Sequence, residues 1–401
     1  MKYVVILGDG MADFRQSFLD NKTPLMVANK PYIDSLAKVS ELGLAKTVPC
    51  GMKPGSDVAN LSVLGYNPHD CYTGRSPLEA ASIGIDLKDT DVTARANLVT
   101  VSNEKNYADK TMIDYSSGEI STTEAKELIE YLAKHINDDK YSLYAGISYR
   151  HCLVIDNGCL IGDLTPPHDI TGKPVKDHLP TSSEGKKLLE IMERSYELLK
   201  DHPVNLKRIK EGKNPANSLW FWGDGTKPNL QKFEDKFNLK GGIISAVDLL
   251  KGIGKLADMR VIEVEGATGN YDTNFSGKAK ACLDNLKDLD FIYLHMEAPD
   301  ECGHHGDTKN KIFSIEQIDE LVVKPVIEGL KATGEDFAVL ICPDHPTPLS
   351  IMTHCSDPVP YLVYKSYKQV KGMDTYDEES AKNAGNFVEN GYELINKLLG
   401  D

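Results

Sequence analysis

Three short apolar segments, each followed by an aspartate, constrain the fold of this chain more than any other feature of its sequence. The segments are residues 3–7, 291–294 and 337–341, and the aspartates are Asp9, Asp300 and Asp344. Apolar runs of this length are typical of strands that are buried on both faces of a parallel sheet. Loops that follow such strands meet at one edge of the sheet, where α/β proteins bind ligands. We therefore expect the three aspartates to lie close together in space.

The segments between these runs favour helices that cover the sheet. Residues 309–330, for example, carry apolar side chains at helical spacing, with Lys and Glu between them. The recurring order of strand, loop, helix and strand predicts an α/β fold with a mostly parallel sheet flanked by helices.

The middle of the chain has a more mixed pattern and predicts an inserted, smaller α+β domain. Its expected strands and helices are residues 91–100, 148–155, 122–137 and 182–199, and the first strand is expected to alternate inward and outward side chains. The seams are expected near residues 84–88 and 212–215. The discontinuous sheet domain would then span residues 1–87 and 213–401, and the inserted domain residues 88–212. A length of 401 residues agrees with two domains, because it exceeds what one hydrophobic core usually supports.

The net charge and the cysteine content limit which classes of partner the protein could bind and which cellular compartment it could occupy. The net charge of −15 argues against nucleic acid and anionic membranes as partners, although metals or a few Arg and Lys residues could still bind a small anionic substrate. No stretch approaches the ~18 uninterrupted apolar residues of a membrane-spanning helix, and the start MKYVVILGDGMADF resembles a strand and turn rather than a signal peptide. The eight cysteines include no CxxC pair, which is typical of reduced thiols in a cytoplasmic protein.

Aspartate and histidine recur together at the ends of the two late apolar segments. Asp300 and His304 are four residues apart, which lets a carboxylate and an imidazole meet on one side of a helical turn. This spacing favours His304 as a metal ligand over the adjacent His305. Asp344 and His345 are neighbours whose side chains point in different directions, so that one loop could serve two metals. Mixed carboxylate and imidazole ligands suit Mn²⁺ or Zn²⁺, and Mg²⁺ less well.

Three further residues join this pattern. His354 follows His345 by nine residues, and Asp9 lies in the first loop. A lone histidine such as His354 is more often structural, but the neighbouring Asp and His residues favour a ligand. Ser56 follows Gly55 and opens an expected helix at residues 57–64, where it could be an ordinary N-cap. The same position favours an anion, and metal coordination would make the hydroxyl a nucleophile.

The order Asp9, Ser56, Asp300, His304, Asp344, His345 and His354 resembles the metal and nucleophile pattern of the alkaline phosphatase superfamily. Within it, ten segments in order along nearly the whole chain resemble the archaeal-type cofactor-independent (2,3-bisphosphoglycerate-independent) phosphoglycerate mutases. They are GDGMAD, PGSDVANLSVLGY, TGRSPLEAASIGIDL, ARANLVT, SYRHCLV, PPHDITGKP, DLLKGIG, VEGATGNYDTN, EAPDECGHHGD and PDHPTP. Pro346 departs from the pattern, because relatives often carry a small residue there, and it would restrict the loop without removing a ligand.

The resemblance implies a role for each matching residue. Asp300, His304 and His354 would hold one divalent metal, and a second set would hold the other: Asp9, Asp344, His345 and the Ser56 oxygen. Ser56 would take the phosphoryl group from phosphoglycerate as phosphoserine and return it to the other hydroxyl of glycerate, with no need for 2,3-bisphosphoglycerate. Two metals would neutralise the charge that develops during this transfer.

A mutase must also keep water from the phosphoserine, and the inserted domain is the expected lid. Four residues could grip the carboxylate and phosphate of the substrate or exchange protons with it: Arg75, Arg95, Arg150 and His151. For Arg95 and Arg150, an ion pair at the surface or at a domain interface is an equal alternative.

Two other functions compete with the mutase hypothesis. A metal-dependent phosphatase or phosphopentomutase could use the same scaffold, because sites rather than folds determine function. The second alternative is a non-catalytic metal- or phosphate-binding protein. The presence of all seven matching residues argues against it. A homoserine kinase is disfavoured, because the Gly-rich residues 265–269 lack the Lys-Ser/Thr of a nucleotide-binding loop.

Overall fold

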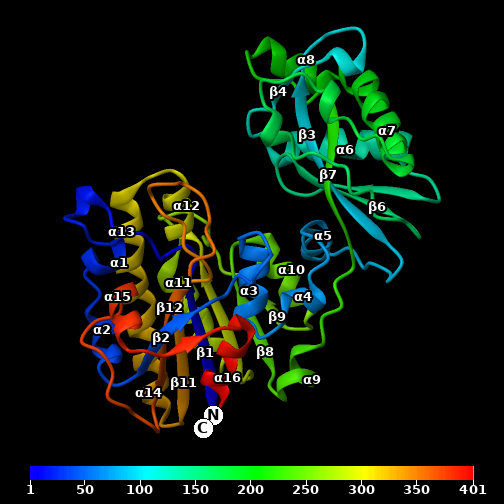
Figure 1. The fold of residues 1–401 in the computed structure, drawn as a ribbon. Helices are drawn as coiled ribbons and strands as arrows, with labels where there is room; N and C mark the ends of the chain where they lie inside the picture. The colour runs from blue at the N-terminus through cyan, green and yellow to red at the C-terminus, as the bar shows by residue number, and fades with distance from the viewer. Residues whose placement is uncertain (401) are drawn as a thin grey trace. The chain divides into compact units, whose positions relative to one another are not determined.

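The computed structural model describes residues 1–400, which form two compact units (Figure 1). Met1–Tyr72 and Asn229–Asp401 make the first unit, and Thr73–Pro228 makes the second. These limits lie outside the predicted seams at residues 84–88 and 212–215, because helix α5 (Ser76–Ser82) packs on strands β3 (Val92–Val101) and β7 (Ser218–Thr226) of the second unit. The first unit is discontinuous in sequence, and the second unit is a continuous segment between its two parts.

The first unit is built on an eight-stranded sheet in the order β13-β2-β12-β11-β1-β10-β8-β9. The three apolar segments form its centre as β1 (Lys2–Gly8), β10 (Phe291–Met296) and β11 (Phe337–Cys342), with β1 parallel to both neighbours. The outer strands are β2 (Glu41–Ala45), β8 (Gly241–Ile244), β9 (Arg260–Ile262), β12 (Val359–Lys365) and β13 (Phe387–Val388). Among the described strands of this sheet, only β12 pairs antiparallel with its neighbours, so the predicted mostly parallel sheet is confirmed.

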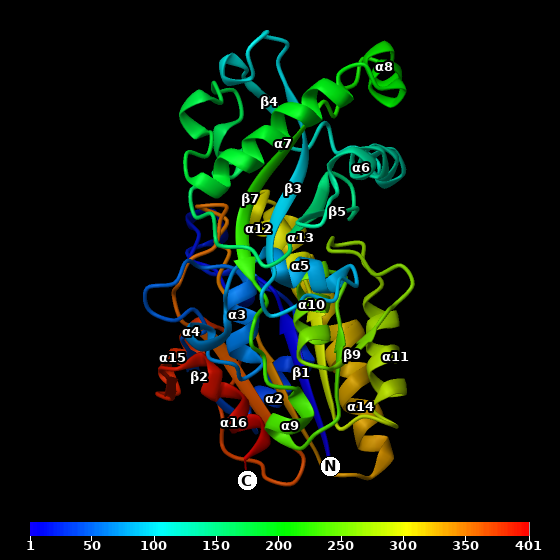
Figure 2. The same ribbon diagram turned by 90° about the vertical axis from the view of Figure 1, so that its right-hand side faces the viewer.

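Helices cover both faces of this sheet (Figures 1 and 2). One face packs on α1 (Pro24–Val27), α2 (Pro31–Ala37), α11 (Phe275–Asn285), α13 (Thr308–Ile318) and α14 (Lys324–Thr333). The other carries α3 (Ser56–Val63), α10 (Asp248–Leu256) and α16 (Leu394–Leu399). Val4 and Ile6 of β1 point into the first helical layer, where they join one large apolar cluster. The strand ends are therefore held rigidly from both sides.

The second unit contains a five-stranded antiparallel sheet with β3 at its centre, between β7 and β6 (Arg150–Ile155). Its remaining strands are β4 (Met112–Asp114) and β5 (Tyr141–Tyr144), and its long helices are α6 (Thr122–Ile136) and α7 (Ser183–Leu199). The expected alternation along β3 is present over its first seven residues, since Val92, Ala94, Ala96 and Leu98 join the apolar core of this unit. All ten residues of the strand are nevertheless buried, because both of its faces are covered. A core that includes α6 and α7 covers one face of this strand, and α5 packs against the unit's sheet as well.

No helix within residues 1–400 is both long enough and apolar enough to cross a lipid bilayer.

The predicted helix at residues 309–330 contains a π-helical segment, Asp319–Val323, that joins α13 to α14. Asp319 is buried there, and its carboxylate accepts the backbone N–H groups of Tyr32 (3.2 Å) and Ile33 (2.6 Å) at the start of α2. The N-cap residue of α2, Lys30, makes no side-chain capping bond. The Asp319 carboxylate, which is far away in the sequence, caps this helix instead.

We predict that Asp319→Ala lowers the free energy of unfolding by about 1–2 kcal/mol, because it removes a helix cap and leaves buried N–H groups without an acceptor. Glu320→Ala is the matched control, since Glu320 lies in the same segment and is exposed. Urea denaturation of both variants measures the difference. Equal stability of the two variants would show that the cap contributes nothing.

Candidate functional site

The three aspartates that follow the central strands come together at one edge of the first unit's sheet. Asp9 directly follows β1, Asp344 lies two residues after β11, and Asp300 lies in α12 (Ala298–His304), which begins after β10. All three side chains are buried. They join histidines in two groups, each with ligand atoms within 4.8 Å of one another: Asp300, His304 and His354, and then Asp9, Asp344 and His345. The parallel pairing of the strands explains this convergence.

In the first group, two imidazoles face one carboxylate. The Asp300 oxygens lie 3.3 Å from His304 Nε2 and 3.4 Å from His354 Nε2. The two Nε2 atoms are 2.8 Å apart. His304 Nδ1 lies 3.1 Å from the Met352 carbonyl, to which it donates when Nε2 is unprotonated. This is the arrangement of a histidine whose Nε2 is available to a metal.

His305 does not take part in this group. Its side chain is 74% exposed, and its Nδ1 lies 2.8 Å from the Glu301 carbonyl of its own helix. The four-residue spacing from Asp300 therefore identified the histidine that faces the cluster.

The second group contains the serine at the start of α3. Ser56 Oγ lies 3.1 Å from His345 Nε2. The same Nε2 atom is 3.6 Å from Asp9 Oδ1 and 3.4 Å from Asp344 Oδ2. Gly10, whose φ is +61°, allows the loop after Asp9 to pass close to Asp300, since a Cβ at residue 10 would lie 2.6 Å from Asp300 Oδ1. A hydroxyl, an imidazole and two carboxylates thus point at one small volume.

Burial and crowding of like charges dominate the electrostatics of the site. Burial, followed by the nearby charges of Asp344, Asp300 and Glu297, raises the pKa of Asp9 well above its usual value. Burial also raises the pKa of Asp300, but hydrogen bonds from His304 and His354 outweigh it and hold this pKa well below its usual range. Within residues 1–400, Asp9 Oδ1 has no hydrogen-bond partner although it is fully buried. A buried orphan oxygen among carboxylates and imidazoles fits a divalent cation.

Several residues that contact these groups were missed by the sequence analysis. The Asn60 amide donates to the Ser56 carbonyl (2.8 Å) and to Asp344 Oδ2 (2.7 Å), and its own oxygen accepts from Tyr293 (2.6 Å). His295 Nε2 lies 2.9 Å from Asp9 Oδ2, and Asp9, His295 and Glu297 form a third group of nearby ligand atoms. The sequence contains only a weak signal for Asn60 and His295. Asn60 lies one helical turn after Ser56, and His295 lies in the strand that precedes Asp300.

The predicted substrate-binding arginines gather in the second unit. Glu79 binds Arg75 Nε (3.0 Å) and Arg95 Nε (2.9 Å), so an ion pair within this unit is present at Arg95. The Arg95 guanidinium also lies 4.0 Å from the ring centre of Trp222. Burial, together with the charges of Arg75 and Arg150 and against the opposing charge of Glu79, lowers the pKa of Arg95 to about 10. Burial alone would raise the pKa of Glu79, but the charges of all three arginines lie close enough to lower the pKa of this carboxyl.

His151 does not share that setting. It is buried in β6, its Nδ1 accepts the backbone N–H of Gly146 (3.0 Å), and burial lowers its pKa to about 3. The neighbouring Arg150 is exposed at the start of the same strand.

Comparison with known proteins gives a consistent result. A family model described as 2,3-bisphosphoglycerate-independent phosphoglycerate mutase matches residues 37–205. The protein of that name from Methanothrix thermoacetophila is 50% identical over 399 residues, which is 100% of both chains. One described as probable, from Geobacter sulfurreducens, is 47% identical over 400 residues, again with full coverage of both chains.

Two solved structures resemble the whole chain. A Pyrococcus horikoshii protein has a TM-score of 0.83 and 29% identity, over 99% of this chain and 96% of its own. The cofactor-independent phosphoglycerate mutase from Thermoplasma acidophilum has a TM-score of 0.67 and 26% identity, over 100% of this chain and 99% of its own.

We predict that Asp300→Asn lowers the number of divalent metal ions bound per chain by one, because the Asp300 carboxylate belongs to the first group, with His304 and His354, and not to the second. Glu301→Gln is the matched control in the same helix. Elemental analysis after equilibrium dialysis measures the stoichiometry. Two ions bound to the Asp300→Asn variant would contradict the assignment.

Proposed function

The chain belongs to the family of 2,3-bisphosphoglycerate-independent phosphoglycerate mutases, and we propose that Ser56 is the residue that carries the phosphoryl group in its reaction. The chain is an isomerase that interconverts 2-phosphoglycerate and 3-phosphoglycerate without 2,3-bisphosphoglycerate. The observation that supports Ser56 is its position at the start of α3, with Oγ 3.1 Å from His345 Nε2. We place this reaction in glycolysis and gluconeogenesis, and we place the protein in the cytoplasm.

Two divalent metal ions fit the two groups of ligands. Asp300, His304 and His354 would hold one, and a second set would hold the other: Asp9, Asp344, His345 and Ser56 Oγ. The unpartnered Asp9 Oδ1 and the mixture of carboxylates with imidazoles support this reading, and favour Mn²⁺ or Zn²⁺ over Mg²⁺. When bound, the ions supply positive charge that neutralises the phosphoryl oxygens and lowers the pKa of the serine hydroxyl.

Ser56 performs the transfer in two symmetrical steps. Its Oγ loses its proton and attacks the phosphorus of phosphoglycerate, the bond between phosphorus and the glycerate oxygen breaks, and that oxygen takes up a proton. Glycerate then reorients, its other hydroxyl loses a proton and attacks the phosphoserine, and Ser56 Oγ is released and takes up a proton. In the phosphoserine, the backbone N–H groups and the dipole of α3 stabilise the negative charge at the helix N-terminus.

Asn60 holds the nucleophile in place during both steps. It lies one turn after Ser56 in α3, and its amide joins the Ser56 carbonyl to Asp344. Because one group spans the nucleophile's backbone and a metal-ligand carboxylate, the two move together. Such fixed geometry is a large part of phosphoryl transfer, in which the protein does little covalent chemistry.

The second unit is the proposed lid and substrate domain. Arg75, Arg95 and Arg150 would bind the substrate's carboxylate and phosphate, and their gathering around Glu79 supports this role. Of the two predicted substrate-binding residues on β6, Arg150 is exposed and His151 is buried. The expected contact between His151 and the substrate stays a prediction, since His151 is buried within the unit.

We predict that Ser56→Ala lowers kcat by on the order of a thousandfold or more, because it removes the nucleophile while most metal ligands remain. Ser62→Ala is the matched control in the same helix, since the buried Ser62 hydroxyl has no hydrogen-bond partner within residues 1–400. An enolase-coupled assay from 3-phosphoglycerate measures turnover, and elemental analysis measures metal content. Full activity in Ser56→Ala would refute the role of Ser56.

We predict that Arg150→Ala raises KM for phosphoglycerate about tenfold to a hundredfold, because it removes a charge-assisted contact with the substrate. The control is Arg194→Ala, which removes an exposed arginine from α7 of the same unit. The enolase-coupled assay, run as a function of substrate concentration, separates KM from kcat. Unchanged values for Arg150→Ala would remove it from the substrate site.

A further inference from the structure

A buried ion pair lies beside the two ligand groups, and the reaction as described makes no use of it. Lys311 of α13 and Asp13 of the loop after β1 are both fully inaccessible at their side chains, with Nζ 2.8 Å from Oδ2. A buried ion pair is a poor source of stability, because desolvation offsets the attraction between its charges. It does fix the geometry of the segments that carry its two charges.

The second bond of Lys311 leads to the ligand groups. Its Nζ donates to the backbone carbonyl of Thr347 (2.7 Å). The Thr347 hydroxyl donates in a short hydrogen bond to Asp300 Oδ1, and its oxygen lies 3.3 Å from His345 Nδ1. One side chain therefore contacts a residue from each group, and its backbone is held by Lys311.

These contacts determine which nitrogen of His345 carries the proton. Because the Thr347 hydroxyl gives its only proton to Asp300, its oxygen can act toward His345 only as an acceptor. Nδ1 of His345 must then be the protonated nitrogen, and Nε2 keeps its lone pair. That lone pair faces Ser56 Oγ, Asp9 and Asp344, where a metal ligand or an acceptor for the serine hydroxyl is needed.

The turn that carries Thr347 is held at both ends by the ion pair. Lys311 binds the Thr347 carbonyl, and the Asp13 carboxylate accepts the backbone N–H of Leu349 (3.1 Å). The preceding Pro346 forms bridge contacts with Met11 and Ala12, so the restriction expected from this proline serves to pair the two loops. Gly303 closes the remaining side, since a Cβ there would lie 2.5 Å from the Thr347 carbonyl.

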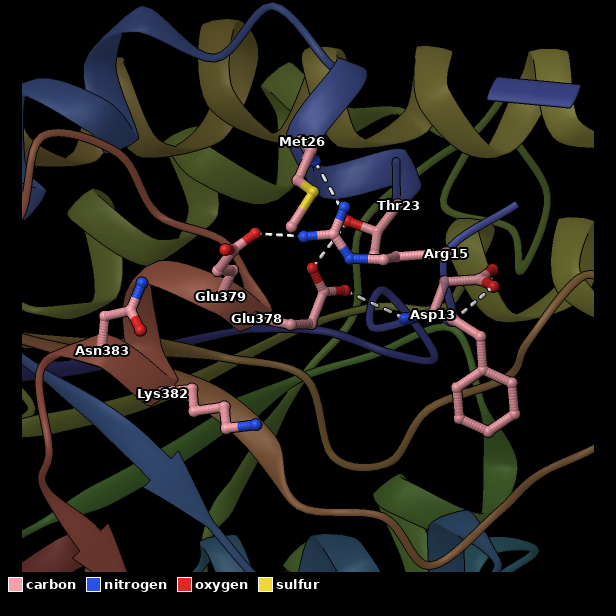
Figure 3. A pocket seen from close by; sticks show the side chains of 9 residues that line it. Asp13, Arg15, Thr23, Met26, Glu378, Glu379, Lys382 and Asn383 are labelled. Atoms are coloured by element: carbon pink, nitrogen blue, oxygen red, sulfur yellow. Dashed lines mark hydrogen bonds and ion pairs between the residues drawn. The ribbon is translucent and has the colours of Figure 1, made fainter. Parts of the chain in front are cut away.

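A surface pocket of about 470 Å³ borders the other side of the Asp13 loop. Figure 3 shows Glu378 in this pocket, between Thr23 and the backbone of Asp13. Its carboxylate accepts the Thr23 hydroxyl (2.6 Å) and the Asp13 N–H (3.0 Å). The loop is thus anchored from the surface as well as from the interior.

We propose that Thr347, held in place by the Lys311–Asp13 pair, is a positioning residue that keeps His345 protonated at Nδ1 and orients Asp300. It thereby sets the ligand atoms of both groups before metal or substrate binds. This inference rests on the metal ligands and the nucleophile proposed above. It differs from them in its consequence, because the ligands remain in the chain when Thr347 is changed.

Thr347→Val tests the hydroxyl, since valine keeps the shape of the side chain and removes the proton donor and acceptor. Metal affinity of the metal-free protein, measured by titration calorimetry, should fall about tenfold to a hundredfold, and kcat should fall similarly with KM changed less than threefold. Ring-nitrogen NMR of His345 in the metal-free protein should show loss of the single Nδ1–H form. Thr347→Ser, which keeps the hydroxyl, should restore the metal affinity, kcat and the Nδ1–H form of His345.

The ion pair is tested by removing both charges, because a single substitution would leave an uncompensated buried charge and could unfold the loop. The double variant Asp13→Asn with Lys311→Met should fold, by circular dichroism, yet bind metal at least tenfold more weakly. Lys309→Met, at an exposed position of α13, is the control and should match the wild type.

The outcomes separate this inference from the proposed function. Wild-type metal affinity and an unchanged His345 spectrum in Thr347→Val would overturn the positioning role while leaving Ser56 and the ligands in place. Loss of activity in Thr347→Val that Thr347→Ser fails to restore would also overturn it, because a steric cause would then explain the loss. A fully active Ser56→Ala enzyme would instead overturn the proposed mechanism.

Discussion

Repulsion among buried carboxylates is the constraint on which the rest of the site depends. Asp9, Asp300 and Asp344 lie at the ends of three adjacent parallel strands, and β1 holds the central position in register with both neighbours. All three side chains are buried. The crowding appears directly in the raised pKa of Asp9, whose largest causes are burial and the charge of Asp344. Two divalent cations at this edge would convert the least favourable part of the fold into its functional centre.

The surrounding polar residues follow from the same constraint. A buried carboxylate has several lone pairs, and each needs a donor or a cation. His295 serves Asp9, Asn60 serves Asp344, and Thr347 serves Asp300. Each of these donors has a second contact that fixes its own orientation. The site is therefore a network in which few side chains have alternative positions, as phosphoryl transfer requires.

Features set by local pattern could be predicted from the sequence, and features set by long-range packing could not. The apolar strands, the four-residue spacing of Asp300 and His304, and the amphipathic helices all have local periodic signals. Asn60, His295 and Thr347 have none, because a buried polar residue is defined by partners far away in the chain. Arg95 was left between two interpretations for the same reason. Its partners Glu79 and Trp222 meet it only after the second unit has folded. The second unit begins before α5 rather than near residues 84–88, because tertiary packing places α5 with β3 and β7.

The arrangement around His345 explains how a mutase site can work in both directions. In the proposed mechanism Ser56 acts as nucleophile toward substrate and as leaving group from phosphoserine, so its oxygen needs an environment that does not change between the two steps. A histidine that could donate a proton from Nε2 would hydrogen-bond the serine oxygen and compete with its attack. With Nδ1 occupied by the proton that Thr347 accepts, Nε2 offers only a lone pair in both steps. Thr347 can enforce this only if its own position is invariant, and a buried charge pair at its carbonyl is a rigid support for that purpose.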